Sequence, residues 1–302
     1  MMKIGKQEIK LTHLDKIYFP KDGLTKGDVI NYYQKISSYI LPYLKDRPES
    51  LYRLPNGINK VGFYQKDADE NTPEWVEIRE IFSESTEKIV HYIICNNKQT
   101  IAYLNNLGCI EFNTWNSRIT KEEYPDYLVL DIDPSARNNF SEVIEVALAA
   151  EEILNALNIE SYPKTSGSTG LHIYIPMNAR YTYEEVKDLA YILMQSINQS
   201  LPDLTTLERS LEKRSKSKIY LDYLQNAKGQ TLCSVYSLRP RNGASVSTPL
   251  EWEELKRGLS PLDFNIWNTL NRLKEKGDLF KPVMGKSIDY TEVFKNLKNI
   301  KI

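Results

Sequence analysis

Cysteine is scarce in this sequence, and its few cysteines are not spaced to bind a metal or to crosslink a secreted fold. Cys95, Cys109 and Cys233 lie far apart, and no C-x-x-C pair occurs. Zinc ribbons need closely spaced cysteine pairs, and disulfide-rich domains need an even cysteine framework. The sequence therefore predicts a protein of the reducing cytoplasm.

Long hydrophobic runs and an excess of one charge are also missing. The first ten residues are polar, and apolar runs such as 128–130 are far shorter than a membrane span. Lys and Arg together number 39 against 40 Asp and Glu, so the net charge of −1 gives no overall positive field. We expect no membrane association. Local groups must carry any nucleic-acid binding, and the basic run 209–218 is interpreted equally well as such a group or as a solvated surface.

The patterning of the chain predicts strands interleaved with helices. Thr25 and Asp28 form a capping motif, and apolar residues at helical spacing then continue until Pro42. Asn139 and Glu142 open a second helix in the same way. The expected strands lie at 50–65 as a hairpin-type arrangement, and at 127–133, 159–164, 171–176 and 219–224. This order favours an α/β fold, with a sheet flanked by helices, over an all-α or all-β fold.

Three aspartates are candidates for metal binding. Asp131 and Asp133 end an apolar strand, and alternate residues of a strand share a face about 6.6 Å apart. Carboxylates so placed suit Mg²⁺ or Mn²⁺, two of which can clamp a phosphoryl transfer. Asp222, in the strand at 219–224, is the natural third ligand. The alternatives are acids that cap a strand end or bridge surface lysines, and for Asp222 a salt bridge to Lys218 or Lys228.

The string SGSTG at 166–170 predicts a tight turn between two strands. Its backbone N–H groups and hydroxyls can meet phosphate oxygens, although Leu171 stands where a Walker loop needs lysine. A turn without a ligand is the commoner meaning of such a string. His172, on the polar face of the next strand, can donate to a phosphate or serve as a structural histidine.

With these residues in place, the sequence resembles the polymerase domain of bacterial ligase D and its stand-alone relatives in the archaeo-eukaryotic primase superfamily. The resemblance extends over about residues 11–255, and the order and spacing of its motifs make coincidence very unlikely. The motifs are LTHLDKIYFPKDGLTKGDVINYY, LYRLPNG, FYQKDA, LGCIEFNTWNSR, YLVLDIDP, KTSGSTGLHIYIP, YLDYLQN and VYSLRPRNGASVSTPLEW.

The resemblance implies a single domain over 1–302 with a primase-like catalytic core. An N-terminal α/β lobe is expected at about 1–110, the catalytic core at about 111–260 and a helical tail at about 261–302. The implied activity is template-dependent addition of NTPs or dNTPs by two-metal phosphoryl transfer. Two Mn²⁺ or Mg²⁺ ions are the implied cofactors.

The resemblance also implies roles for individual residues. Asp131, Asp133 and Asp222 match the catalytic metal ligands. The implied contacts to the nucleotide are Ser166, His172, Lys218 and Arg239, with Arg53 as an addition. The implied contacts to a DNA 5′-phosphate are His13, Lys16 and Lys26. The residues implied to stack on template bases are Phe63 and Tyr64. For the two lysines and the two aromatic residues, a helix start and a hydrophobic core are the alternative interpretations.

Three positions depart from the family pattern. Asn113 stands where many relatives have histidine, Thr169 where many have lysine, and His13 where asparagine is usual. The first two changes remove a basic group near the nucleotide. We therefore expect activity that is weaker, or more dependent on Mn²⁺, than in typical members.

The leading hypothesis is a cytoplasmic, nucleoid-associated polymerase that fills gaps at double-strand breaks in non-homologous end joining. It would recognise a 5′-phosphate and work with a Ku-type end-binding protein and a separate ligase, since no ligase or phosphoesterase module is visible. An alternative is a catalytically weak DNA-end adaptor of the same fold, which has no need of three aimed carboxylates. A D-x-D glycosyltransferase is a third reading, disfavoured by Lys16, Lys26 and the string YSLRPR.

Overall fold

The structure is a computed structural model that describes residues 2–4, 7–84 and 86–299. Its internal contacts divide the chain into two units built from interleaved segments. Unit 1 takes its described residues from 1–120, 231–247 and 264–277, and unit 2 from 121–230, 248–263 and 278–302. Each unit therefore depends on segments that are distant in the sequence.

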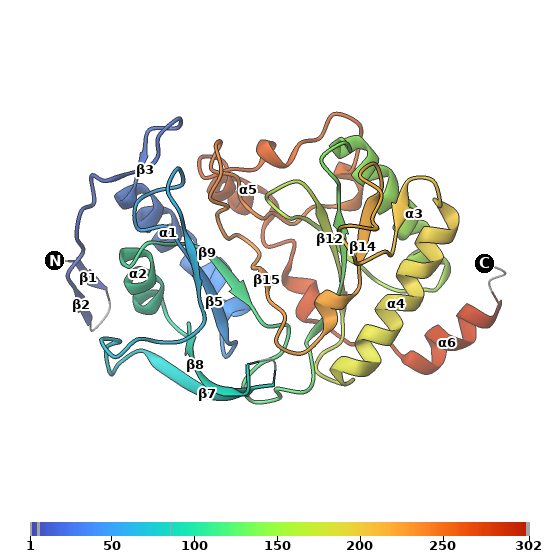
Figure 1. Cartoon of the computed structure of the whole chain (residues 1–302), viewed down its shortest axis with the longest axis horizontal. Helices are drawn as coiled ribbons and strands as arrows, with labels where there is room; N and C mark the ends of the chain where they lie inside the picture. The colour runs from blue at the N-terminus through green and yellow to red at the C-terminus, as the bar shows by residue number, and fades with distance from the viewer. Residues whose placement is uncertain (1, 5–6, 85, 300–302) are drawn as a thin grey trace. The chain divides into compact units, whose positions relative to one another are not determined.

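Unit 1 is centred on a four-stranded antiparallel sheet (Figure 1). Its strands are, in spatial order, β15 (Leu232–Cys233), β9 (Cys109–Thr114), β5 (Glu49–Arg53) and β6 (Phe63–Gln65). Three two-stranded sheets accompany it: β1 (Met2–Ile4) with β2 (Gln7–Ile9), β3 (Ile17–Phe19) with β4 (Leu24–Thr25), and β7 (Glu77–Ser83) with β8 (Lys88–Ile94). The pairing of β5 with β6 confirms the expected hairpin-type strands at 50–65.

Helices α1 (Lys26–Leu44) and α2 (Lys98–Asn106) pack against each other in unit 1. Helix α1 begins at the predicted capping box, in which Thr25 and Asp28 satisfy each other's backbone N–H groups. The helix passes Pro42, where the sequence predicted its end, and stops at Leu44. Proline removes a single backbone donor, and the N–H of Lys45 still donates to the Leu41 carbonyl, so the last turn closes.

Unit 2 contains a five-stranded sheet that confirms the expected α/β class. The spatial order is β11 (Tyr162–Thr165), β12 (Leu171–Pro176), β10 (Tyr127–Asp133), β14 (Ile219–Asp222) and β13 (Thr205–Thr206), antiparallel except for the β13–β14 pair. Helices α3 (Phe140–Ala156) and α4 (Tyr183–Ser200) begin at capping boxes and pack side by side on the sheet (Figure 1). Strand β11 starts later than predicted, and β14 ends at Asp222 before a 3₁₀ turn at Leu224–Asn226.

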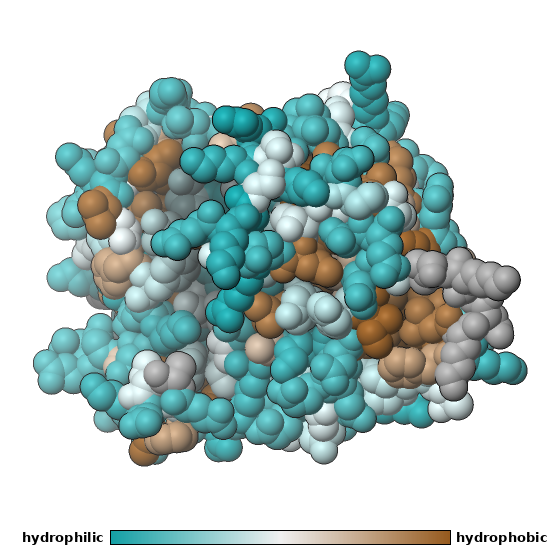
Figure 2. Space-filling model, turned by 45° about the vertical axis from the view of Figure 1, so that its right-hand side comes forward, coloured by the Kyte–Doolittle hydropathy of each residue, from teal (hydrophilic) through white to brown (hydrophobic). Residues whose placement is uncertain are grey.

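The last segments are short helices. Helix α5 (Thr269–Lys276) belongs to unit 1, and α6 (Tyr290–Asn299) belongs to unit 2. Further 3₁₀ turns lie at Trp252–Glu254, Pro261–Asp263 and Lys281–Met284. Residues 300–302 of the expected helical tail lie outside the described residues. Within the described part, no helix has the length and hydropathy needed to cross a membrane. The face shown in Figure 2 is mostly hydrophilic.

One buried asparagine fixes strand β10 where the short strand β14 has ended. The Asn226 side chain is fully buried and makes two hydrogen bonds to the backbone of Val129: its Nδ2 donates to the carbonyl, and its Oδ1 accepts from the N–H, both at 2.8 Å. The amide thus replaces a missing strand partner, because buried backbone groups need hydrogen bonds. Val129 precedes Asp131 by two residues, so the clamp also sets the register of the acids.

We expect Asn226→Ala to lower the free energy of unfolding by about 1–3 kcal/mol, because two buried backbone groups lose their partner. Chemical denaturation followed by circular dichroism measures the change. Asn155→Ala, at an exposed position of α3, is the matched control and should change stability little. Equal stability of the two variants would contradict the clamp.

Candidate active site

Three carboxylates gather on one face of the unit 2 sheet. Asp131 on β10 lies directly opposite Asp222 on β14, and Asp133 lies opposite Tyr220. Residues directly opposite in an antiparallel pair share a face, with Cβ atoms about 4.5–5.5 Å apart. Asp131 is 3% exposed, whereas Asp133 is exposed at the strand end. The strand register therefore places the three acids that the sequence singled out on one face.

The same face continues as a row of polar side chains across the sheet. His172 on β12 is opposite Asp131, and Lys164 on β11 is opposite His172. His172 Nε2 lies 3.4 Å from Asp131 Oδ1, and the Lys164 ammonium lies 5.6 Å from the centre of the Tyr174 ring. Both His172 and Lys164 are buried. His172 thus lies against Asp131, and Lys164 adds a buried cationic side chain farther along the same face.

Asp222 is held by its own segment. Its Oδ1 accepts hydrogen bonds from Leu224 N at 2.8 Å and from the Tyr220 hydroxyl at 3.4 Å. Burial raises the pKa of Asp222, and the hydrogen bond from Leu224 opposes that shift. The two lysines offered as alternative partners are engaged elsewhere, since Lys218 donates to the Pro202 carbonyl and Lys228 pairs with Glu123.

The acid face fits divalent cations by its chemistry. Like charges directly opposite on neighbouring strands repel, and a buried carboxylate is costly without a positive partner. Mg²⁺ and Mn²⁺ supply that charge and prefer carboxylate oxygens. As the side chains of the described residues stand, no three of His, Cys, Asp or Glu converge closely enough to hold an ion. Asp131 is turned toward His172 and Asp222 toward Leu224, so binding would require both carboxylates to rotate.

The SGSTG turn lies beside the acid face and is closed by its first serine. The Ser166 hydroxyl accepts from the N–H groups of Ser168 and Gly170, both at 3.1 Å. A Cβ on Gly170 would lie 2.4 Å from the Ile132 carbonyl and 3.4 Å from Asp133 Oδ1. Glycine is therefore required at 170, because the start of β12 lies so close to Ile132 of β10, the residue between Asp131 and Asp133, that no side chain fits.

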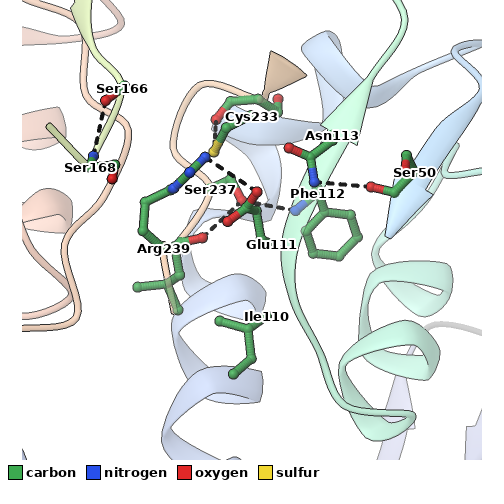
Figure 3. A network of polar contacts seen from close by, with 12 residues as sticks. Ser50, Ile110, Glu111, Phe112, Asn113, Ser166, Ser168, Cys233, Ser237 and Arg239 are labelled. Carbon is green, nitrogen blue, oxygen red and sulfur yellow. Dashed lines mark hydrogen bonds and ion pairs between the residues drawn. The ribbon is translucent and has the colours of Figure 1, made fainter. Parts of the chain in front are cut away.

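Arg239, one of the expected nucleotide contacts, belongs to unit 1 and is held by a buried carboxylate (Figure 3). Its Nη1 lies 3.2 Å from Glu111 Oε1, and its guanidinium also hydrogen-bonds the Cys233 sulfur. Glu111 is 2% exposed, and nothing in the motif distinguished it from a surface acid. Asn113, one of the departures, donates from Nδ2 to the Ser50 carbonyl at 3.1 Å. The neutral amide thus serves as a sheet contact.

The expected template contacts lie on the exposed strand β6. Phe63 and Tyr64 are 47% and 61% exposed, so they are not core residues. They are neighbours on a strand and point to opposite faces. The Arg53 guanidinium lies 5.1 Å from the Phe63 ring centre and donates to Gln65 Oε1 and to the Leu107 carbonyl. Arg53 thus supports Phe63.

The expected 5′-phosphate lysines come together in unit 1. The Lys26 N–H donates to the Lys16 carbonyl at 2.8 Å, and the Lys26 ammonium donates to the Thr12 carbonyl at 2.7 Å. The Lys16 ammonium donates to Asn56 Oδ1 at 2.6 Å. Burial, and then the charge of Lys16, lowers the pKa of Lys26 to about 8. His13 is exposed, has a φ of 50° and accepts the Lys16 N–H through its carbonyl.

Sequence reasoning missed three buried polar residues near these sites: Lys164, Asn226 and Glu111. Each lies inside a motif string, Lys164 in KTSG, Asn226 in YLQN and Glu111 in IEFN. Alternation could not mark two of them, because Asn226 lies in a 3₁₀ turn and Glu111 lies in β9, a strand that was not among those expected from the sequence.

The comparisons with known proteins agree on one family. The model of the family described as "LigD, primase-polymerase domain" matches residues 25–280. The bifunctional non-homologous end joining protein LigD of Bacillus subtilis is 34% identical over 271 residues, which cover 89% of this chain and 43% of that protein. The multifunctional LigD of Mycolicibacterium smegmatis is 30% identical over 280 residues, which cover 92% of this chain and 36% of that protein. This chain therefore spans less than half the length of these relatives.

A solved structure extends the likeness to the fold. The polymerase domain from Mycobacterium tuberculosis ligase D, solved in complex with DNA, aligns with a TM-score of 0.86 at 27% identity. The alignment covers 94% of this chain and all of that one. The expected fold is thereby confirmed.

The low pKa of Lys26 generates a pH-dependent prediction. An ammonium with a pKa of about 8 loses its charge as the pH rises, whereas a charged contact to a phosphate requires the proton. We expect the preference for 5′-phosphorylated over 5′-hydroxyl DNA to decline above about pH 8. A bound phosphate stabilises the ammonium, so it shifts this decline to a higher pH. Binding titrations of both DNAs at several pH values measure it. Lys26→Arg should remove the decline, because arginine stays charged. A preference that is constant with pH in the unmodified protein would contradict a contact between Lys26 and the 5′-phosphate.

Proposed function

This chain belongs to the LigD primase-polymerase domain family, and on that premise we propose that it is a template-dependent polymerase acting at DNA double-strand breaks. The proposed reaction adds NTPs or dNTPs to a 3′-hydroxyl in a gap. Nucleotidyl transfer and end joining are the chemistry and the pathway that the family supplies.

The observation that carries the proposal is the opposition of Asp131 and Asp222, with Asp133 on the same face. This acid face would hold two Mg²⁺ or Mn²⁺ ions, which supply charge stabilisation for the attacking and leaving oxygens when bound. His172 Nε2 lies 3.4 Å from Asp131 Oδ1, and the Leu224 N–H donates to Asp222 Oδ1 at 2.8 Å. These contacts hold Asp131 toward β12 and Asp222 toward its own segment, so both carboxylates would rotate when the ions bind.

Other residues of the chain would bind the substrates. We propose that Lys16 and Lys26, with His13 beside them, hold the 5′-phosphate at the far side of the gap. Ser166, His172, Lys218, Arg239 and Arg53 are the proposed nucleotide contacts, and Arg239 is the best supported because Glu111 orients its guanidinium. The DNA in the M. tuberculosis complex supports DNA as the partner proposed for this chain.

We also propose that the polymerase works beside a Ku-type end-binding protein and a DNA ligase in the bacterial cytoplasm. The end-joining function named for the B. subtilis and M. smegmatis relatives supports this context.

We expect Asp131→Ala, Asp133→Ala and Asp222→Ala each to abolish nucleotide addition while DNA binding survives, because each variant removes a carboxylate from the acid face only. Primer extension on a gapped, 5′-phosphorylated DNA with Mg²⁺ or Mn²⁺ measures addition, and fluorescence anisotropy measures binding. Asp203→Ala, an exposed acid of the same unit, is the control.

The same assay separates the polymerase from the adaptor alternative. Extension at a near wild-type rate by any of the three variants would overturn the triad assignment. An unmodified protein that binds phosphorylated ends tightly but adds no nucleotide with either metal would favour the adaptor.

A further inference from the structure

The aromatic residues of β6 do not form one stacking surface. In the antiparallel β5–β6 pair, Phe63 lies opposite Arg53, and Tyr64 lies opposite Tyr52. Residues opposite each other share a face, and successive residues alternate between faces. Phe63 therefore shares its face with Arg53, and Tyr64 shares the other with Tyr52.

Tyr64 rests on Tyr52 in a parallel stack. The ring centres lie 4.5 Å apart with an interplanar angle of 23°. Tyr64 is 61% exposed and Tyr52 is partly buried. Tyr52 thus supports one side of a ring whose other parts are open to solvent, as a base-stacking residue requires.

The chain makes room for this stack at Gly62. A Cβ there would lie 2.8 Å from Leu54 Cγ, 2.9 Å from the Arg53 carbonyl and 3.1 Å from Tyr52 Cε2. Only glycine allows the start of β6 to lie this close to β5, so the backbone at residue 62 packs directly against the Tyr52 ring. This packing restricts the position of Tyr64, two residues later.

The face that carries Tyr52 also leads to the proposed nucleotide contact. Glu111 lies directly opposite Tyr52 on the neighbouring strand β9. Its carboxylate holds Arg239 at 3.2 Å, as Figure 3 shows. The aromatic stack and the buried ion pair are therefore neighbours on one face of the unit 1 sheet.

We propose that Tyr52 is a positioning residue for template binding: it backs Tyr64, so that a template base stacks on the Tyr64–Tyr52 pair and not on a Phe63–Tyr64 pair. The proposal rests on the proposed polymerase function, because it assumes that a template strand is bound. It adds a residue to which the resemblance assigned no role, and it places Phe63 on a separate face with Arg53.

Binding of a single-stranded template carrying 2-aminopurine tests the proposal, since stacking quenches its fluorescence and titration gives the affinity. We expect Tyr52→Leu to weaken binding by about 5- to 30-fold and to reduce the quenching as Tyr64→Leu does, because each removes a stacking contribution. Tyr52→Phe should behave as the unmodified protein, because the ring remains. The double variant Tyr52→Leu/Tyr64→Leu should bind no more weakly than Tyr64→Leu alone.

Phe63→Leu is the matched control, from the same strand but the opposite face. Its effect should add to that of Tyr52→Leu, because the two side chains lie on opposite faces of the β5–β6 pair. If Tyr52→Leu does not fold, as judged by circular dichroism, Tyr52→Thr replaces it, since threonine suits a strand. Wild-type affinity and quenching for Tyr52→Leu, or additivity between Tyr52 and Tyr64, would overturn the inference. An unmodified protein that binds no template would instead overturn the proposed function.

Discussion

The unit 2 sheet places two aspartates directly opposite each other in the register of neighbouring strands. Asp131 and Asp222 are directly opposite in the β10–β14 pair, an arrangement that costs free energy in the absence of a cation. The surrounding residues hold this arrangement in place. Asn226 clamps the backbone of β10, Gly170 lets β12 approach, and His172 lies against Asp131. These contacts keep the two carboxylates on one face, where the proposed divalent cations would offset their repulsion.

Unit 1 carries cationic side chains that we propose as contacts to anionic groups, among them Lys16, Lys26 and Arg239. Lys26 is 4% exposed and lies beside Lys16, so desolvation and repulsion both weaken its hold on the proton. An anion bound between the two lysines would relieve both costs. The environment of Arg239 differs from that of the lysines, because the Glu111 carboxylate balances its charge inside the sheet. The two lysines are therefore suited to distinguishing an anionic group from a neutral one. Arg239 is suited to setting the direction in which its guanidinium points.

How much the sequence could predict depends on how local each feature is. Alternation placed Asp131 and Asp133 on one face, and the capping box located the start of α1, because both need only neighbouring residues. The opposition of Asp131 and Asp222 needs the register between strands about ninety residues apart, which pattern alone does not specify. The role of Asn226 depends on β14 ending early. The sheet of unit 1 was harder still to predict, since β15 pairs with β9 although more than a hundred residues separate them in the sequence. The placement of Phe63 and Tyr64 on opposite faces, by contrast, followed from alternation and could have been predicted from the sequence.

Two of the departures, Asn113 and Thr169, are neutral residues at positions where the family resemblance leads us to expect a basic group. Thr169 is exposed, and the turn that contains it is closed by Ser166 through Ser168 and Gly170, so no turn contact depends on residue 169. Asn113 occupies its buried place with a hydrogen bond to the Ser50 carbonyl. A triphosphate would thus meet the same framework with fewer basic side chains. More of its negative charge must then be balanced by cations at the acid face, which is the physical basis for expecting activity in this chain to depend strongly on the divalent metal.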